Sequence, residues 1–127
     1  MNHLDRARVR QLAEVVNSGI QPVQNLRVMQ RLERELDFSA DGKKVWSRDW
    51  IAFGFEALHR LMEKYGGRYS FGDEVTFADL CLVPQLYNAR RFAVDLSVFP
   101  RLLQVEERLS ALPSFERARP ENQLDAV

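Results

Sequence analysis

The sequence predicts an all-α fold, and three features of it point that way. Apolar residues recur every three or four positions in four separate stretches, the spacing of one buried helix face. Glycines and prolines interrupt or bound these stretches, where helices usually bend, begin or end. Short β-like pieces such as residues 68–71 are better interpreted as loop. We therefore expect a helical bundle.

The first apolar stripe covers residues 4–36 and is interrupted near its middle. Gly19 and Pro22 lie inside it. Proline removes one backbone donor and clashes with the preceding turn, so we expect a kink or a break there. The polar segment 37–44 that follows contains an Asp-Gly pair and predicts a turn rather than a helix.

The second helix is expected at about residues 46–65. Its apolar stripe includes Trp46 and Trp50, which we assign to the core and not to a site. Gly66 and Gly67 are expected to end it, because glycine readily adopts the left-handed conformation of a helix C-cap.

The third helix carries the clearest start signal in the chain. Thr76 can cap the first turn, and Asp79 can reach back to the amide of Thr76, forming a capping box with Asp in place of Glu. Apolar residues on either side of the cap are placed as a hydrophobic staple, Val75 and Leu80. The helix should continue to about residue 92, with a bend at Pro84.

A fourth helix is expected at about residues 100–112. Pro113 should end it, followed by a short turn around Phe115 and a polar tail from Pro120.

Length and charge narrow the class of protein. The 127 residues fit one domain, and 18 basic side chains balance 18 acidic ones. No net field would recruit nucleic acid or an acidic membrane, and the arginines near the start indicate a solvated helix face. No stretch approaches the roughly 20 apolar residues of a membrane span, and no signal peptide is recognisable. We expect a cytoplasmic protein with no nucleic acid or membrane partner.

The residue types that carry chemistry are sparse. Cys81 is the single cysteine and lies in an apolar run, so we expect a buried, inert thiol and no disulfide. His3 and His59 are far apart, and neither has a second donor one helical turn away, so no metal site is expected. Neither a phosphate-binding glycine loop nor a catalytic triad is indicated. We therefore assign no catalytic residue.

Four segments nevertheless resemble a known family. Residues 19–26 (GIQPVQNL) resemble the GIQPxQN segment of zeta-class glutathione transferases, and residues 50–58 are similar to the second C-terminal-domain helix of that class. Residues 72–80 (GDEVTFADL) resemble the GDxxTxAD element found across glutathione transferases. Residues 84–96 (PQLYNARRFAVDL) resemble the PQxxNAxRFxVDL stretch of maleylacetoacetate isomerases. The resemblance covers about residues 6–120, and its flanking motifs make it specific to the zeta class.

The resemblance implies a fold and a function. Residues 1–127 would form the helical C-terminal domain of glutathione transferases, a right-handed bundle with the third helix as its buried centre. The implied reaction is glutathione-dependent cis–trans isomerisation of maleylacetoacetate in tyrosine and phenylalanine breakdown. We expect the thioredoxin-like N-terminal domain, which activates the glutathione sulfur, to be absent, so that the chain alone is inactive and binds glutathione weakly or not at all. The alternative is a non-enzymatic interaction module.

The family also implies particular site residues. Gln21, Asn25, Leu26 and Arg27 match positions where that family contacts glutathione. Gln21 and Asn25 are four residues apart, so both amides could project from one helical face. Alternatively, these amides patch backbone groups freed by the neighbouring proline.

Arg91 matches an arginine that holds a carboxylate of the dicarboxylic substrate in the family. A guanidinium suits that role because it binds a carboxylate through two parallel hydrogen bonds. Alternatively, Arg91 forms a surface pair with Asp95 at the i, i+4 spacing.

Self-association is expected as well. In the family, the first two helices of this domain help to form a homodimer. The first stripe is too wide to face one core, since Val15, Val16, Val28 and Met29 widen it. We therefore expect a two-fold dimer through the first two helices.

Overall fold

The computed structural model describes residues 1–126 of the chain. Within that range most helices are joined by short connections, a longer loop (residues 66–76) joins α4 to α5, and the sole β-type pairing is an isolated bridge between Gly66 and Gly72. The all-α prediction is confirmed. No helix among these residues is both long and apolar enough to cross a membrane.

The first apolar stripe folds as four consecutive helical segments. They are α1 (His3–Glu14), the π-helix η1 (Val15–Ile20), α2 (Gln21–Gln24) and α3 (Leu26–Leu36). The Gln21 amide donates to the carbonyl of Val16, five residues back, and Pro22 has no amide to donate. The predicted interruption is confirmed. A second break follows at Asn25, whose backbone is extended (φ −61°, ψ 145°).

Helix α4 (Ala40–Tyr65) begins earlier than predicted. Ser39 is its N-cap, and the Ser39 hydroxyl accepts from the Gly42 amide at 3.0 Å. The turn between α3 and α4 is made by Asp37 in the left-handed conformation (φ 51°). The prediction of a non-helical segment through residue 44 is therefore wrong, because a serine cap outweighed the Asp-Gly turn signal.

Gly66 does end α4, but for a different reason from the predicted one. Its backbone is extended (φ −73°, ψ 156°), not left-handed. A Cβ atom there would lie 2.4 Å from the Met62 carbonyl oxygen and 2.8 Å from Arg101 Nη2. Glycine is favoured at this position because the Met62 carbonyl and the Arg101 side chain approach so closely, and not because of its backbone conformation.

Helix α5 (Phe77–Arg91) starts at the predicted capping box, which is confirmed. The Thr76 amide donates to Asp79 Oδ2 at 2.7 Å, and the Ser70 amide donates to Asp79 Oδ1 at 2.9 Å. Asp79 has no exposed surface. One buried carboxylate therefore caps α5 and also anchors the preceding loop. The proposed staple residues, Val75 and Leu80, remain exposed.

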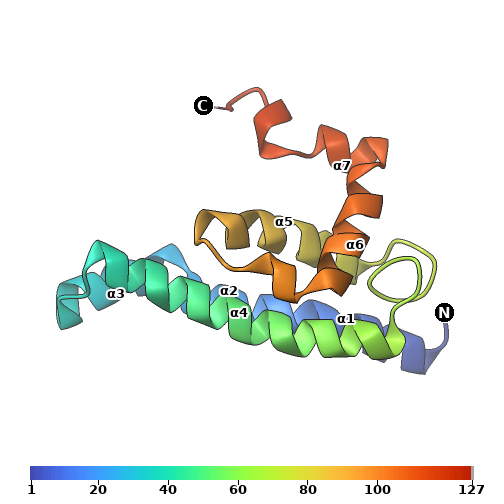
Figure 1. The fold of residues 1–127 in the computed structure, drawn as a ribbon, viewed down its shortest axis with the longest axis horizontal. Helices are drawn as coiled ribbons and strands as arrows, with labels where there is room; N and C mark the ends of the chain where they lie inside the picture. The colour runs from blue at the N-terminus through green and yellow to red at the C-terminus, as the bar shows by residue number, and fades with distance from the viewer. Residues whose placement is uncertain (127) are drawn as a thin grey trace.

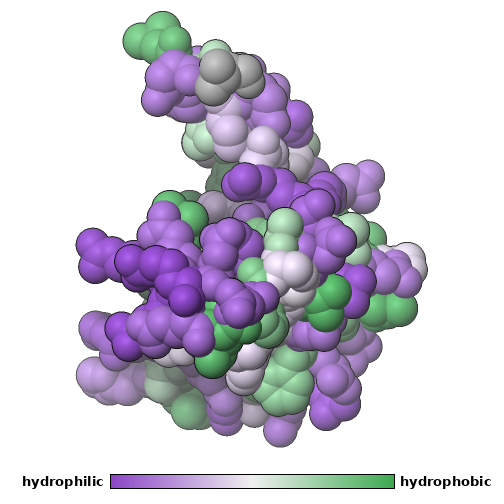
Figure 2. Space-filling view, turned by 90° about the vertical axis from the view of Figure 1, so that its left-hand side faces the viewer, coloured by the Kyte–Doolittle hydropathy of each residue, from purple (hydrophilic) through white to green (hydrophobic). Residues whose placement is uncertain are grey.

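Four short elements complete the described chain. They are η2 (Leu96–Val98), α6 (Pro100–Ser110), α7 (Pro113–Arg117) and η3 (Pro120–Asn122). Pro113 lies at the start of α7 and not merely after α6, because the first turn of a helix needs no proline amide. Figure 2 looks onto the end formed by α3 and the start of α4, and the C-terminal segment stands above the body as a narrower lobe.

The core lies where α1, η1, α4, α5 and α6 meet. Helix α4 runs antiparallel to the α1–α3 segments, and α5 lies beside α1 and η1 (Figure 1). Gly54 of α4 allows the close crossing, since a Cβ atom there would lie 2.4 Å from Ile20 Cγ1.

Helix α5 buries only one of its faces. Its inward residues include Leu82 and Leu86, which are fully buried. Its opposite side, here called the α5 outer face, consists of Phe77, Leu80, Pro84 and Tyr87, all exposed. The helix was expected to be the buried centre of the bundle, but only its inward face is buried.

Phe55 of α4 belongs to the core, but three other aromatic side chains of this helix lie outside it. Together with Phe38, which precedes the helix, they form an aromatic ridge: Phe38, Trp46, Trp50 and Phe53, with neighbouring ring centroids 5.9 to 6.1 Å apart. Trp46 is half-buried, whereas Trp50 is 37% exposed and Phe53 is 68% exposed. Assigning Trp50 to the core was wrong.

The residues expected to widen the first stripe do not form an exposed patch. Val16 and Met29 are buried, and Val15 packs against the core. The π-helix and the break at Asn25 turn successive segments of the stripe, so that more of it faces inward than a straight helix would allow.

Candidate functional site

Three glutamine side chains meet between α2 and α5. Here they are called the amide cluster: Gln21, Gln24 and Gln85. Gln21 Nε2 donates to Gln85 Oε1, and Gln24 Nε2 donates to the same oxygen at 3.0 Å. Gln85 has no exposed surface and Gln24 is 7% exposed, whereas Gln21 is exposed. A surface amide is thus tied to a fully buried one.

The amide cluster is polar in a place where polarity is costly. Among residues 1–126, Gln85 Nε2 and Gln24 Oε1 have no hydrogen-bond partner although both atoms are buried. Burying an amide without all its hydrogen bonds costs on the order of 1–3 kcal/mol. An apolar side chain would avoid this cost, so stability alone does not account for glutamine at position 85.

Asn25 acts as the N-cap of α3. Its side-chain oxygen accepts from the Arg27 amide at 3.0 Å. Because Asn25 lies outside α2, it does not share a helical face with Gln21, and that part of the prediction is wrong. The alternative, in which an amide satisfies freed backbone groups, fits Asn25 but not Gln21.

The carbonyl left open at the end of α2 is satisfied by an indole. Trp46 Nε1 donates to the Val23 carbonyl oxygen at 2.8 Å. Trp46 therefore ties α4 to the break between α2 and α3. Leu26 and Arg27, which follow the break, are exposed on the first turn of α3.

Arg91 ends α5, and its side chain faces solvent. Among the ion pairs formed by residues 1–126, none involves Arg91. The proposed partner Asp95 instead accepts from the amide and the hydroxyl of Ser97, which lowers the pKa of Asp95. The alternative of a surface pair with Asp95 is therefore not observed. Arg90, in contrast, binds Glu106 through two contacts of 2.6 Å.

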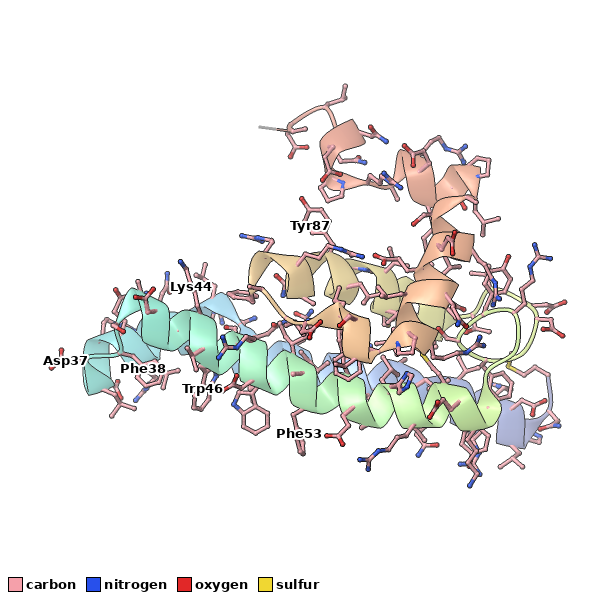
Figure 3. All side chains as sticks on the ribbon, in the orientation of Figure 1. Asp37, Phe38, Lys44, Trp46, Phe53 and Tyr87 are labelled. Atoms are coloured by element: carbon pink, nitrogen blue, oxygen red, sulfur yellow. The ribbon has the colours of Figure 1, made fainter. Side chains whose placement is uncertain are left out.

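A groove of about 720 Å³ lies between the α5 outer face and the C-terminal segment. Its α5 side includes Leu80, Pro84 and Tyr87, and its other wall includes Phe115 and Pro120. Tyr87 points from α5 toward that segment, whereas Trp46 and Phe53 project from the other side of the bundle (Figure 3). Glu121 beside Tyr87 raises the pKa of the phenol, mainly by accepting its hydrogen bond.

The remaining candidates have structural surroundings. Cys81 is half-buried rather than buried, and Asn17 Nδ2 lies 3.4 Å from its sulfur. Partial burial raises the pKa of the thiol, which opposes a role as nucleophile. Among residues 1–126, no group of three or more potential metal ligands is found.

The structure thus unites Gln21 with two residues that the sequence analysis did not select. Gln24 and Gln85 both lie within quoted motifs, but they are 61 residues apart and no helical periodicity pairs them. A glutamine spaced with the apolar face of α5, directly after a mid-helix proline, was the available signal.

Comparison with known proteins decides the family. The family model described as "Glutathione S-transferase, C-terminal domain" matches residues 28–117. The chain belongs to the glutathione S-transferase family. Among relatives, it is 44% identical over 120 residues to a probable maleylacetoacetate isomerase 2 of Drosophila melanogaster, covering 94% of this chain and 50% of the relative.

Solved glutathione S-transferases share the fold closely. A maleylacetoacetate isomerase from Anaeromyxobacter dehalogenans, with bound dicarboxyethyl glutathione and citrate, is 48% identical, with a TM-score of 0.89 and coverage of 96% of this chain and 54% of that one. A holo maleylpyruvate isomerase, described as a bacterial zeta-class enzyme, is 38% identical, with a TM-score of 0.96 and coverage of 100% and 61%. The chain spans about half the length of the curated relatives it matches.

Proposed function

We propose that residues 1–127 act as the C-terminal domain of a glutathione-dependent maleylacetoacetate isomerase. The observation that carries this proposal is that Gln21, an exposed residue of the zeta-class motif, is hydrogen-bonded to the buried Gln85. The family match along most of the chain supports it as well. Relatives include maleylacetoacetate and maleylpyruvate isomerases. Curated relatives from an insect, a bacterium and a mammal, at 41% to 44% identity, are maleylacetoacetate isomerases or probable ones, which favours maleylacetoacetate as substrate.

Gln21 and the start of α3 would hold glutathione. A peptide-like ligand offers both N–H and C=O groups, and amide side chains can pair with either. Gln21, Leu26 and Arg27 are all exposed and therefore accessible, while the Asn25 side-chain oxygen is already engaged in capping α3. When bound, glutathione supplies the thiolate that adds to the conjugated double bond and leaves after rotation.

Arg91 would orient the substrate. Its guanidinium is exposed at the end of α5 and can donate two parallel hydrogen bonds to a carboxylate. A fixed carboxylate places the double bond in one position relative to the sulfur, and such positioning is itself a large part of catalysis. No residue of this domain is proposed as a catalytic acid, base or nucleophile.

The partner domain would be thioredoxin-like and would pack on the α5 outer face. Relatives are about twice as long as this chain, so about half of each lies outside the match. Phe77, Leu80 and Tyr87 of this face are exposed apolar or aromatic residues, the kind of surface that a second domain covers. That domain would activate the glutathione sulfur.

A second copy of the chain would pack on the aromatic ridge, giving a homodimer. Trp50 and Phe53 are exposed on α4, and Leu26 is exposed on α3. These residues, rather than the widened first stripe, support self-association through the first two helical regions. Sedimentation across concentrations should detect a dimer, and Phe53→Glu should shift it toward monomer. A wild-type chain that remains monomeric at high micromolar concentration would exclude this interface.

The setting proposed for the enzyme is cytoplasmic tyrosine and phenylalanine breakdown. The activity is testable by fusing this chain behind the thioredoxin-like domain of the Anaeromyxobacter dehalogenans relative. The fusion should isomerise maleylacetoacetate with glutathione, whereas the 127-residue chain alone should not. A folded but inactive fusion would reject the enzymatic proposal and favour an interaction module. Robust turnover by the chain alone would reject the claim that the thioredoxin-like domain is needed to activate the glutathione sulfur.

A further inference from the structure

We infer that Gln85 is a positioning residue: it fixes the Gln21 amide so that the Gln21 carbonyl oxygen is the group left to bind a ligand. The inference rests on the proposed function, in which Gln21 contacts glutathione. It adds a residue and a direction to that contact.

The hydrogen bond itself sets the direction. Gln21 Nε2 is the donor and Gln85 Oε1 is the acceptor, so the nitrogen end of the Gln21 amide turns toward α5. The other end of the planar amide then turns away from Gln85. An amide oxygen can only accept, so Gln21 would select a ligand N–H group such as those of a peptide backbone or an amine.

Gln85 is suited to hold a partner in place because it cannot move easily itself. It is fully buried in α5, directly after Pro84, and its oxygen accepts from two glutamines at once. Gln24 is buried as well and donates to the same oxygen. The surface amide of Gln21 is therefore held by one buried glutamine of another helix, Gln85.

The unpartnered atoms argue against a purely structural role. Gln85 Nε2 and Gln24 Oε1 are buried without partners among the described residues, so this cluster costs stability that an apolar trio would keep. The cluster instead gives the Gln21 amide a fixed orientation toward a ligand. A preorganised contact of this kind strengthens binding, because it loses less conformational freedom when the ligand binds.

The test uses the 127-residue chain labelled with ¹⁵N at its glutamine side chains. NMR relaxation should find the Gln21 NH₂ group ordered in the wild-type chain, and Gln30, an exposed glutamine of α3, mobile. Gln85→Met removes the acceptor, so the Gln21 order parameter should fall below about 0.6, the range of flexible groups. Gln85→Glu keeps an acceptor oxygen and should retain the order.

Gln24→Met is the matched control. It removes one hydrogen bond to the same Gln85 oxygen but leaves the Gln21 contact, so Gln21 should stay ordered. The inference is overturned if Gln21 is as mobile as Gln30 in the wild-type chain, a result that needs no variant to fold. It is also overturned if Gln85→Glu loosens Gln21 as much as Gln85→Met does.

Glutathione at millimolar concentration, added to the same variants fused behind the thioredoxin-like domain, then separates the two proposals. Shifts of the Gln21 NH₂ signals in the wild-type and Gln85→Glu chains, with none in Gln85→Met, support both. An ordered Gln21 that does not respond to glutathione upholds the positioning contact and counts against the ligand assigned under the proposed function.

Discussion

The start of α5 and the break between η1 and α3 are held by hydrogen bonds of very different sequence separation. At the start of α5, Asp79 reaches a partner three residues away and another nine residues away. At the break, Gln21 reaches a partner 64 residues away, and the Trp46 indole reaches back 23 residues. The first arrangement can form as soon as α5 forms. The second requires the bundle to be assembled.

The two regions also differ in what their polar groups are left to do. Both oxygens of Asp79 are engaged and the residue is buried, so the carboxylate has only a structural role. The amide cluster keeps one exposed amide and two buried atoms without partners. A motif whose polar groups are all hydrogen-bonded to each other or to the backbone stabilises the fold. A motif that retains polar groups without hydrogen-bond partners is a candidate binding site.

The largest effect is expected at the cap of α5. Asp79→Ala leaves the buried Ser70 amide and the Thr76 amide without their acceptor, so the free energy of unfolding should fall by about 3 kcal/mol or more. Thr76→Ala, which removes the other half of the capping box, should cost about 1 kcal/mol. Chemical denaturation measures both losses.

Asp73→Ala is the control for that pair. Asp73 is an exposed acid of the same loop, and its Oδ1 accepts from the Arg68 amide at 2.7 Å. The expected cost is about 1 kcal/mol. Equal losses for Asp79→Ala and Asp73→Ala would contradict the assignment of the buried carboxylate as an anchor.

A smaller effect is expected at the break. Asn25→Ala removes the cap of α3 and should lower the free energy of unfolding by about 1 kcal/mol, whereas Asn25→Asp keeps an acceptor and should cost little. If Asn25→Ala unfolds at the same denaturant concentration as the wild-type chain, Asn25 does not act as a cap and its side chain is available to a ligand.

The smallest effect concerns Cys81, which joins the two regions through Asn17 of η1. The raised pKa of its thiol means a smaller thiolate fraction than an ordinary cysteine has at the same pH. Alkylation by iodoacetamide at neutral pH should therefore be slower than for a cysteine peptide and should rise as the pH increases. A rate equal to or above that of the peptide would identify a reactive thiol.

The sequence could predict the local hydrogen bonds at the start of α5 but not the long-range ones of the amide cluster. The cap at Thr76 and Asp79 was predictable because both partners lie within one helical turn. The interruption at Pro22 was predictable from covalent structure alone. The pairing of Gln21 with Gln85 was not, because it depends on how the bundle brings α2 to α5, and no local pattern encodes that arrangement. The exposure of Trp50 was missed for a related reason: periodicity identifies an apolar face but not what covers it.

The central claim, that the cap serves the fold and the amide cluster serves the ligand, is tested most directly by two variants of the active fusion. Thr76→Ala and Gln85→Met are each measured for their free energy of unfolding and for the KM of glutathione, well below the melting temperature. Thr76→Ala should lower stability by about 1 kcal/mol and leave the KM unchanged. Gln85→Met should raise the KM roughly fivefold, the effect of one lost hydrogen bond, with kcat little changed. A Gln85→Met fusion with an unchanged KM for glutathione would contradict the claim.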